Sequence, residues 1–355
     1  MTILGIHHIT MVCSNAQQTV DFYTRVLGLR LVKQTVNFDA PDTYHLYFGD
    51  EAGTPGTLLT FFEWPHAPHG RWGIGATHHL ALTVETPDAQ LKWKRRLTDR
   101  GLRVTGPYDR SYFRSIYFTD PDGLILEIAT RGPGWTIDEA PDALGGRVVM
   151  PRAGQMAGGR DEAAIAATTW PEPVEAITPD MRLDGLHHIT AIASDIEATN
   201  AFYAEVLGLH LVKKTVNFDD PDAPHYYWGA GEGLPGTIVT YFGYRPQYMR
   251  RGQLGIGLTH HFAFAVTDDE TQLEWLDRLR SMSLRVTPVQ DRKYFRSIYF
   301  HDPDGHLLEI ATVPPGFAVD EARDALGAVL SLPAWLEPQR AGIEAVLTPI
   351  DYRRV

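Results

Sequence analysis

The chain has 355 residues, of which 44% are hydrophobic and 21% charged, and its formal net charge is −12. This composition is typical of a globular protein of two or three domains, and the negative charge argues against a nucleic acid or an anionic membrane as partner. One cysteine, Cys13, excludes an internal disulfide framework. With neither a basic leader nor a run of about 18 apolar residues, we expect a cytoplasmic protein without a membrane span.

The chain repeats itself at an offset of about 180 residues. The segment GIHHITMVCSNAQQTVDFYTRVLGLRLVKQTVNFDAPD at 5–42 returns at 185–222, and the segment at 76–130 returns at 258–312. Such repeats indicate two homologous halves. We place them at 1–145 and 181–335, joined by a Gly-, Ala- and Pro-rich surface linker at 146–180 and followed by a C-terminal tail at 336–355.

Each half contains two smaller modules of one pattern. A short alternating strand opens with a His-His pair, a helix follows, and three β-rich stretches complete the module. Helices are predicted at Ala16–Leu27 and Leu91–Arg100, ending at Gly28 and Gly101. The predicted fold class is therefore α+β, with four βαβββ modules. Their ranges are 2–64, 75–130, 182–244 and 257–312.

A turn near the end of each half precedes a strand that contains a glutamate. Asp302-Pro303-Asp304-Gly305 separates predicted strands at Tyr294–Phe300 and Leu307–Thr312. A carboxylate inside such a strand, Glu309, is costly unless it is paired or binds a metal. His261 lies 48 residues before Glu309, and His79 lies 48 residues before Glu127. This recurrence predicts metal ligands on neighbouring strands of both halves.

The four modules, each opening with a histidine, and the DPDGxxLE string in two of them resemble the vicinal oxygen chelate superfamily. That superfamily includes glyoxalase I, extradiol dioxygenases and antibiotic-resistance proteins. The strings LGLRLVKQTVNFDAPDTYHLYFGD, GTPGT and DRKYFRSIY resemble its ring-cleaving hydroquinone dioxygenase branch. The resemblance implies two open, barrel-like sheets built from paired modules.

The resemblance also places the metal ligand at the second histidine of each pair. The implied ligands are His8, His79, His188, His261, Glu127 and Glu309. If modules pair in a crossed order, the triads are His8–His261–Glu309 and His188–His79–Glu127. Sequential pairing would join His8 to His79 and Glu127, and His188 to His261 and Glu309. The linker permits both orders, and the resemblance favours the crossed one.

Two histidines and one carboxylate leave open metal positions, as Fe(II) needs to activate O₂. We expect Fe(II), with Mn(II) or another divalent metal as an alternative. The resemblance further implies site roles for Arg292, Tyr299 and their equivalents Arg110 and Tyr117. Thr10 and Thr190 face inward beside the ligand histidines and are expected to hydrogen-bond the substrate. His7 and His260 are further candidate site residues.

Other histidines are predicted with less specific roles. Strict strand alternation places His7, His78, His187 and His260 on the face opposite the ligands, where they either support the ligands or pack outside. His45 and His225 match between the halves, and a core or strand-edge role is at least as good an interpretation as a site role. Five histidines break the repeat and are predicted at the surface: His66, His69, His210, His301 and His306.

The predicted function is an extradiol-type ring-cleaving dioxygenase that acts on a small hydroquinone- or catechol-type aromatic and O₂. One alternative is a glyoxalase-like isomerase or lyase, which needs a fourth protein ligand. The corresponding strands, GTLLTFF and GTIVTYF, hold no carboxylate, and Glu63 after the first is Gly243 after the second. The other alternative is a non-catalytic, aromatic- or drug-binding resistance protein. The oligomeric state stays open, a homo-oligomer included.

Overall fold

The computed structural model describes residues 1–352 and contains the four predicted βαβββ modules. The first comprises β1 (Gly5–Cys13), α1 (Ala16–Asp21) with a π-helical turn (Phe22–Val26), β2 (Arg30–Asn37), β3 (Ala40–Gly49) and β4 (Leu58–Glu63). The second comprises β5 (Thr77–Val84), α2 (Pro87–Asp99), β6 (Thr105–Asp109), β7 (Arg114–Thr119) and β8 (Ile125–Thr130). The third comprises β9 (Leu186–Ala193), α4 (Ile196–Ala201) with a π-helical turn (Phe202–Val206), β10 (His210–Asn217), β11 (Asp220–Gly229) and β12 (Ile238–Gly243). The fourth comprises β13 (Thr259–Val266), α5 (Asp269–Ser281), β14 (Gln290–Asp291), β15 (Arg296–His301) and β16 (Leu307–Thr312).

Side-chain caps determine where the helices begin. The Asn15 side chain accepts from Gln18 N at the start of α1, and the Thr86 side chain accepts from the backbone of α2. The second helix therefore begins at Pro87, earlier than the predicted Leu91. Gly28, with φ +73°, follows the π-helical turn and gives the chain a backbone conformation that other residues adopt with difficulty.

The modules pair in the crossed order, which confirms that prediction. Strand β1 lies antiparallel to β13, and β5 lies antiparallel to β9. The chain accordingly forms two compact units that cut across the sequence halves. We name them the terminal unit (Met1–Arg71 with the chain from Gln253 onward) and the central unit (Trp72–Gly252).

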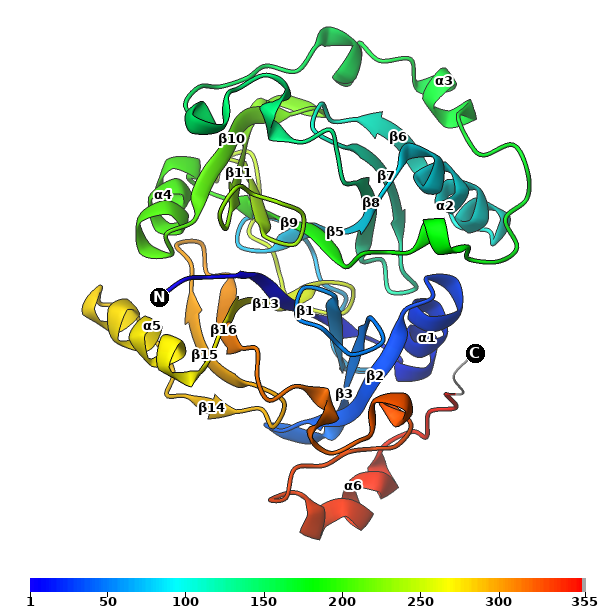
Figure 1. Cartoon of the computed structure of the whole chain (residues 1–355), viewed down its shortest axis with the longest axis vertical. Helices are drawn as coiled ribbons and strands as arrows, with labels where there is room; N and C mark the ends of the chain where they lie inside the picture. Colours follow the sequence, from blue (N-terminus) through cyan, green and yellow to red (C-terminus); the bar gives the residue numbers. More distant parts are fainter. Residues whose placement is uncertain (353–355) are drawn as a thin grey trace. The chain divides into compact units, whose positions relative to one another are not determined.

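Each unit contains one eight-stranded sheet, curled into an open half-barrel (Figure 1). The strand order is β14-β15-β16-β13-β1-β4-β3-β2 in the terminal unit and β10-β11-β12-β9-β5-β8-β7-β6 in the central unit. Helices lie on the outside of each curl, α1 and α5 on the first sheet and α2 and α4 on the second (Figure 1). The inner faces are thereby left to the histidines of β1, β5, β9 and β13. No helix among residues 1–352 is long and apolar enough to cross a bilayer.

The predicted linker is an ordered strap that packs on the central unit. It contains α3 (Glu162–Ala167), and the buried Lys94 of α2 donates to the carbonyls of Ile165, Ala166 and Thr168 at 2.7–3.0 Å. The terminal unit has a matching helix, α6 (Arg340–Val346). Short 3-10 turns complete the structure at Trp135–Ile137, Pro141–Ala143, Ala153–Gln155, Pro179–Met181, Phe317–Val319, Arg323–Ala325 and Glu337–Gln339.

A buried lysine ties the strand β2 to the segment that follows β16. Lys33 is fully buried, and its Nζ lies 2.7 Å from Asp320 and also pairs with Glu321. It sits 4.8 Å from the ring centroid of Tyr294. The same arrangement recurs in the central unit with Lys213, Asp138, Glu139 and Tyr112. Because an unpaired buried charge is strongly destabilising, each lysine requires the partner module that supplies its carboxylates.

Candidate metal centres

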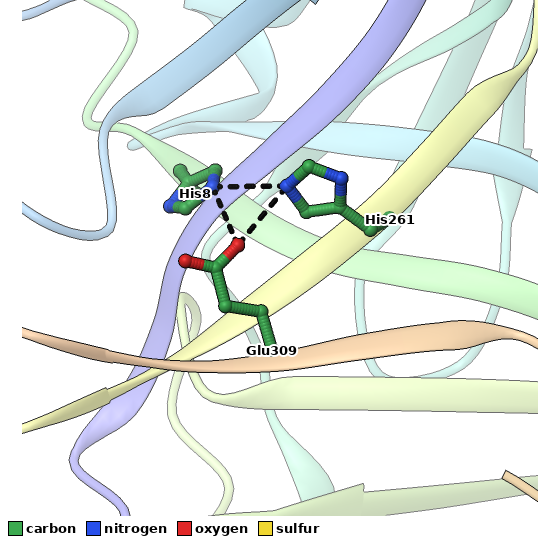
Figure 2. Close-up of side chains that lie close together, drawn as sticks. All are labelled: His8, His261 and Glu309. Atoms are coloured by element: carbon green, nitrogen blue, oxygen red, sulfur yellow. Dashed lines mark hydrogen bonds and ion pairs between the residues drawn. The ribbon is translucent and has the colours of Figure 1, made fainter. Parts of the chain in front are cut away.

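Three side chains converge on the inner face of the terminal unit. His8 comes from β1, His261 from β13 and Glu309 from β16 (Figure 2). The two Nε2 atoms lie 3.4 Å apart, and Glu309 Oε2 lies 3.3 Å from His8 Nε2 and 3.0 Å from His261 Nε2. All three residues are buried. Residues 253 positions apart in the chain therefore form one triad.

The central unit holds the same triad from equivalent strands. His188 comes from β9, His79 from β5 and Glu127 from β8. The imidazole Nε2 atoms are 3.3 Å apart, and Glu127 Oε2 lies 3.0 Å from His79 and 3.4 Å from His188. The structure thus brings all six predicted ligands together as two sets of three.

The donor atoms of both triads fit a divalent metal. In each triad the ligand atoms lie within 4.8 Å of one another. Glu309 Oε1 accepts from Ser297 and Glu127 Oε1 accepts from Ser115, so the Oε2 atom of each glutamate is the one that faces the two imidazoles. Burial alone would raise the pKa of Glu309, but the adjacent His8 and His261 hold it well below its usual value. Two imidazole nitrogens and one carboxylate oxygen are the donor set of non-haem iron sites.

The preceding histidine of each pair contacts the ligand instead of pointing away. The Nδ1–Nδ1 distances are 2.8–2.9 Å in His7–His8, His78–His79, His187–His188 and His260–His261. Register irregularities at these positions of β1, β5, β9 and β13 break the expected alternation. With Nε2 facing the centre, the Nδ1–H of the ligand donates to its neighbour, which fixes the tautomer and the ring orientation.

These neighbouring histidines are neutral in the folded protein. Burial, followed by the adjacent ligand histidine, lowers the pKa of His7 and of His260 to about 3. A neutral ring retains the lone pair that accepts the hydrogen bond. His260 also lines the cavity of the terminal unit, next to Phe62, whereas His7 lies behind His8 against Phe295.

Arg292 and Tyr299 lie together in the wall of the terminal cavity. Arg292 Nε donates to Tyr299 Oη at 3.2 Å, and its Nη1 donates to Asp39 at 2.9 Å. The Tyr299 ring meets His261 edge-on at 5.7 Å between centroids. Burial and the nearby Glu309 raise the pKa of Tyr299, so its hydroxyl stays protonated.

Arg110 and Tyr117 occupy the same places in the central unit, but the rim of that cavity differs. Arg110 Nη2 donates to Asp219 at 3.0 Å. A second cation, Arg160 from the strap, pairs with the same Asp219 at 2.6 Å and stacks on Tyr108 at 4.3 Å from its centroid. Nothing in the repeat pointed to Arg160, because the strap follows the last strand of the module.

Thr10 and Thr190 are fully buried beneath the ligands. Thr10 Oγ1 bonds Thr60 Oγ1 at 2.7 Å, whereas Thr190 Oγ1 bonds Thr240 at 3.0 Å and also His79 Nε2 at 3.0 Å. Neither threonine lines its cavity. Their hydroxyls thus contact strands β4 and β12 and a ligand histidine, whereas the sequence led us to expect contact with a substrate.

The triads face cavities of about 440 Å³ in the terminal unit and about 390 Å³ in the central unit. Aromatic rings and a few polar groups line both. Glu63 lies at the end of β4, but its Oε1 accepts from Ala16 N at 2.8 Å, at the start of α1. Among the described lining residues of the terminal cavity, the one carboxylate is Asp39, which is paired with Arg292. Within the described residues of this site, the structure therefore offers no second carboxylate that could serve as a fourth metal ligand.

One surface prediction is wrong. His306 is buried, and its Nδ1 lies 2.9 Å from the Asp302 carboxylate of the turn before β16. The turn before β16 covers the imidazole. Because His306 has no equivalent histidine in the other half, the sequence repeat gave no sign of this contact. The four other histidines of that group are exposed, as predicted: His66, His69, His210 and His301.

The curled sheets of paired βαβββ modules, each with a His-His-Glu triad, define a metal-binding vicinal oxygen chelate protein. The chain matches the Glyoxalase/Bleomycin resistance protein/Dioxygenase superfamily at residues 5–128 and 185–310 and belongs to it. This confirms the resemblance drawn from the sequence.

Particular relatives extend over the whole chain. It is 37% identical over 352 residues to the Bacillus subtilis protein named "Putative ring-cleaving dioxygenase MhqO", covering 99% of this chain and 98% of that protein. It is 31% identical to the chlorohydroquinone/hydroquinone 1,2-dioxygenase of Sphingobium indicum, covering 94% and 92%. A crystal structure described as a "putative dioxygenase" from Bacillus subtilis superposes with a TM-score of 0.79 at 35% identity, covering 100% of this chain and 99% of that one. Glyoxalase I from Zea mays, at 15% identity, a TM-score of 0.56 and coverage of 87% and 92%, shares the fold.

Proposed function

We propose that this protein is an extradiol-type ring-cleaving dioxygenase that acts on a small hydroquinone- or catechol-type aromatic with O₂ and Fe(II). The observation that carries the proposal is the triad itself: two imidazoles and one carboxylate beside an aromatic-lined cavity whose described lining offers no second, unpaired carboxylate as a fourth ligand. Three protein ligands leave coordination positions for both a substrate hydroxyl and O₂. The relatives that span the chain support the same chemistry.

The roles of the protein groups follow from their positions. A metal bound by the triad would supply Lewis acidity, which lowers the pKa of a coordinated hydroxyl and orients the reactants. Arg292 is a fixed cation whose Nε is held by Tyr299, so it stabilises negative charge that develops on oxygen. The protonated hydroxyl of Tyr299 is a hydrogen-bond donor beside His261. His7 and His260 orient the ligands through their Nδ1 atoms.

Both units carry these groups, so we propose two active centres per chain. Arg110, Tyr117 and the His187–His188 and His78–His79 pairs reproduce the terminal set in the central unit. Mn(II) or another divalent ion could occupy the same donors, and Fe(II) is the form that we expect to turn over O₂. A reducing compartment, the cytoplasm, suits such a metal and the single Cys13.

The decisive test is oxygen stoichiometry after anaerobic loading with Fe(II). Hydroquinones and catechols are supplied as a panel, and O₂ uptake is measured against loss of the aromatic absorbance. We expect one O₂ per ring lost, with no uptake by metal-free protein or by the double variant Glu309→Gln, Glu127→Gln. Conversion of a glutathione hemithioacetal without O₂ uptake would overturn the proposal in favour of an isomerase. Tight aromatic binding without metal or turnover would favour a binding protein.

A further inference from the structure

Each cavity is lined by one imidazole that neither belongs to a triad nor hydrogen-bonds a triad histidine. In the terminal unit this is His45 on β3, and Tyr47, two residues further along the same strand, also lines the cavity. Tyr47 Oη lies 3.0 Å from His45 Nδ1, and the two rings are 4.1 Å apart between centroids. Phe62 packs on the other side of the imidazole at 4.3 Å. The ring is thus held firmly between two aromatic side chains.

The pair is the cavity-facing end of a series of hydrogen bonds. His45 Nε2 lies 3.0 Å from Thr60 Oγ1, and Thr60 Oγ1 lies 2.7 Å from Thr10 Oγ1. The series therefore runs from the cavity wall through β3 and β4 to β1, two residues beyond the ligand His8. Both nitrogens of His45 are engaged, so its ring is oriented before any ligand arrives.

The central unit repeats the series atom for atom. Tyr227 Oη lies 3.0 Å from His225 Nδ1, and His225 Nε2 lies 2.8 Å from Thr240 Oγ1. Thr240 bonds Thr190 at 3.0 Å, and both Tyr227 and His225 line the cavity. Two cavities whose rims differ have thus kept one internal arrangement.

Counting protons shows what this arrangement offers to a ligand. Burial, and then the nearby His8, His261 and Arg292, lowers the pKa of His45 well below its usual value, so the ring is neutral. A neutral imidazole has one N–H and one lone pair. If Nε2–H donates to Thr60, Nδ1 accepts the Tyr47 proton, and Tyr47 Oη can accept a hydrogen bond from a ligand. In the opposite order, Tyr47 O–H can donate to a ligand oxygen.

We propose that the Tyr47–His45 pair, and Tyr227–His225 in the central unit, form a subsite for the aromatic hydroxyl that does not bind the metal. The proposal rests on the proposed function, because it assigns a place to the second oxygen of a dihydroxy aromatic. Because the donor and acceptor roles in this series of hydrogen bonds can reverse, Tyr47 Oη can accept from a ligand hydroxyl or donate to a ligand oxyanion. A neutral hydrogen bond of this kind contributes about 0.5–1.5 kcal/mol, or roughly 2- to 12-fold in affinity.

Anaerobic binding tests the subsite without turnover. Fe(II)-loaded protein in a His79→Ala background, which leaves the terminal centre as the intact triad, is titrated by calorimetry with phenol and with hydroquinone. We expect hydroquinone to bind about 2- to 12-fold more tightly than phenol. Tyr47→Phe should abolish that preference while leaving the Kd of phenol unchanged. In the same background, Tyr227→Phe is the matched control and should leave both Kd values unchanged.

A second experiment exchanges the roles of the two units, so that the test does not depend on the folding of a single variant. In a His261→Ala background, Tyr227→Phe should abolish the preference, and Tyr47→Phe becomes the control. Equal weakening of phenol and hydroquinone by Tyr47→Phe would show a purely structural role and overturn the inference, as would an unchanged preference. Failure of the proposed function is seen separately, as an absence of O₂ uptake by the wild-type protein with every dihydroxy aromatic.

Discussion

The two cavities are lined by equivalent residues in their interiors and by different residues at their rims. The triads have matching distances, and the His-His contacts and the Tyr-His pairs recur in both. At the rim, Gln290 in the terminal unit stands where the central unit has Tyr108, and Arg160 adds a second cation to the central one. Asp39 is largely exposed, whereas Asp219 is held by two arginines. Strand register determines the interior, and the strap and loops that follow the strands are free to diverge.

The largest expected effect comes from removing one ligand of one triad. His261→Ala and His79→Ala should each reduce bound metal from two per chain to one, because loss of a direct ligand weakens binding by more than about 100-fold, beyond what loss of an outer hydrogen bond costs. Metal analysis after anaerobic loading and desalting measures the stoichiometry. The exposed His301→Ala should retain two metals. If the wild type holds one metal and His79→Ala does not change that, the comparison fails and the central triad is a relic.

The next effect concerns the buried lysines. Lys33→Met leaves the buried Glu321 carboxylate without its cation, whereas Asp320 keeps its ion pair with Lys293, and we expect a loss of about 3–5 kcal/mol in the free energy of unfolding of the terminal unit. Lys213→Met should act equally on the central unit. Urea denaturation of the metal-free protein measures both. Arg95→Met, which removes a partly exposed ion pair with Asp99, is the control and should cost less than about 1 kcal/mol. A loss below that value for Lys33→Met would contradict the prediction.

A smaller effect separates the two rims. Arg160, which pairs with Asp219 and with the exposed Glu162, gives the central cavity a second guanidinium that can bind a carboxylate, so a substrate such as 2,5-dihydroxybenzoate should be favoured there over hydroquinone. In a His261→Ala background, Arg160→Gln should raise the KM for the carboxylated substrate by about 3- to 10-fold, the effect of one partly screened charge. The KM for hydroquinone should change little. If both substrates respond equally, Arg160 acts on the shape of the rim and not through its charge.

A further effect, on stability alone, is a pH dependence. His45 is neutral in the folded chain, with its pKa held well below 6.5 by burial, then by His8, His261 and Arg292, and partly raised by Glu309. Below about pH 6.5 the unfolded chain gains a proton that the folded chain does not take, so stability falls as the pH falls. The slope for one such histidine reaches about 1.4 kcal/mol per pH unit.

His45→Gln should make this slope shallower in the metal-free protein between about pH 6.5 and 5. Urea midpoints at a series of pH values measure it. His225→Gln should have the same effect in the central unit, since burial, and then the nearby His188, His79 and Arg110, also lower the pKa of His225. If neither substitution alters the slope, groups other than these two imidazoles cause the loss of stability at acidic pH.

The features that could be predicted from the sequence are those that repeat along it. The His-His pairs, the glutamates and the turns before them recur at equal spacing, and this recurrence indicated the modules and the histidine and glutamate ligands of the second and fourth. The family resemblance placed the ligand at the second histidine of each pair and so completed the set of six. The crossed order was favoured by family resemblance, because spacing alone fits both orders. The lysine contacts now give a physical reason for it: Lys33 needs the carboxylates that follow β16.

The missed features depend on contacts between strands. Strict alternation turned His7 away from the centre, but the register irregularity beside it turns the ring onto His8. Ser297 and the His45–Tyr47 pair had no motif, since their roles arise from the partners that neighbouring strands place beside them. Arg160 comes from a segment whose composition suggested only a linker.

The crossed pairing has a consequence for the order in which the chain folds. The central unit is one continuous stretch, so it can complete its sheet while the rest of the chain is still being synthesised. The terminal unit must wait, because its first strand pairs with β13, which emerges about 250 residues later. Until then β1 presents an unpaired edge, the kind of surface that invites aggregation. Early folding of the central unit shortens the flexible loop that the terminal unit must close, and so lowers its entropic cost.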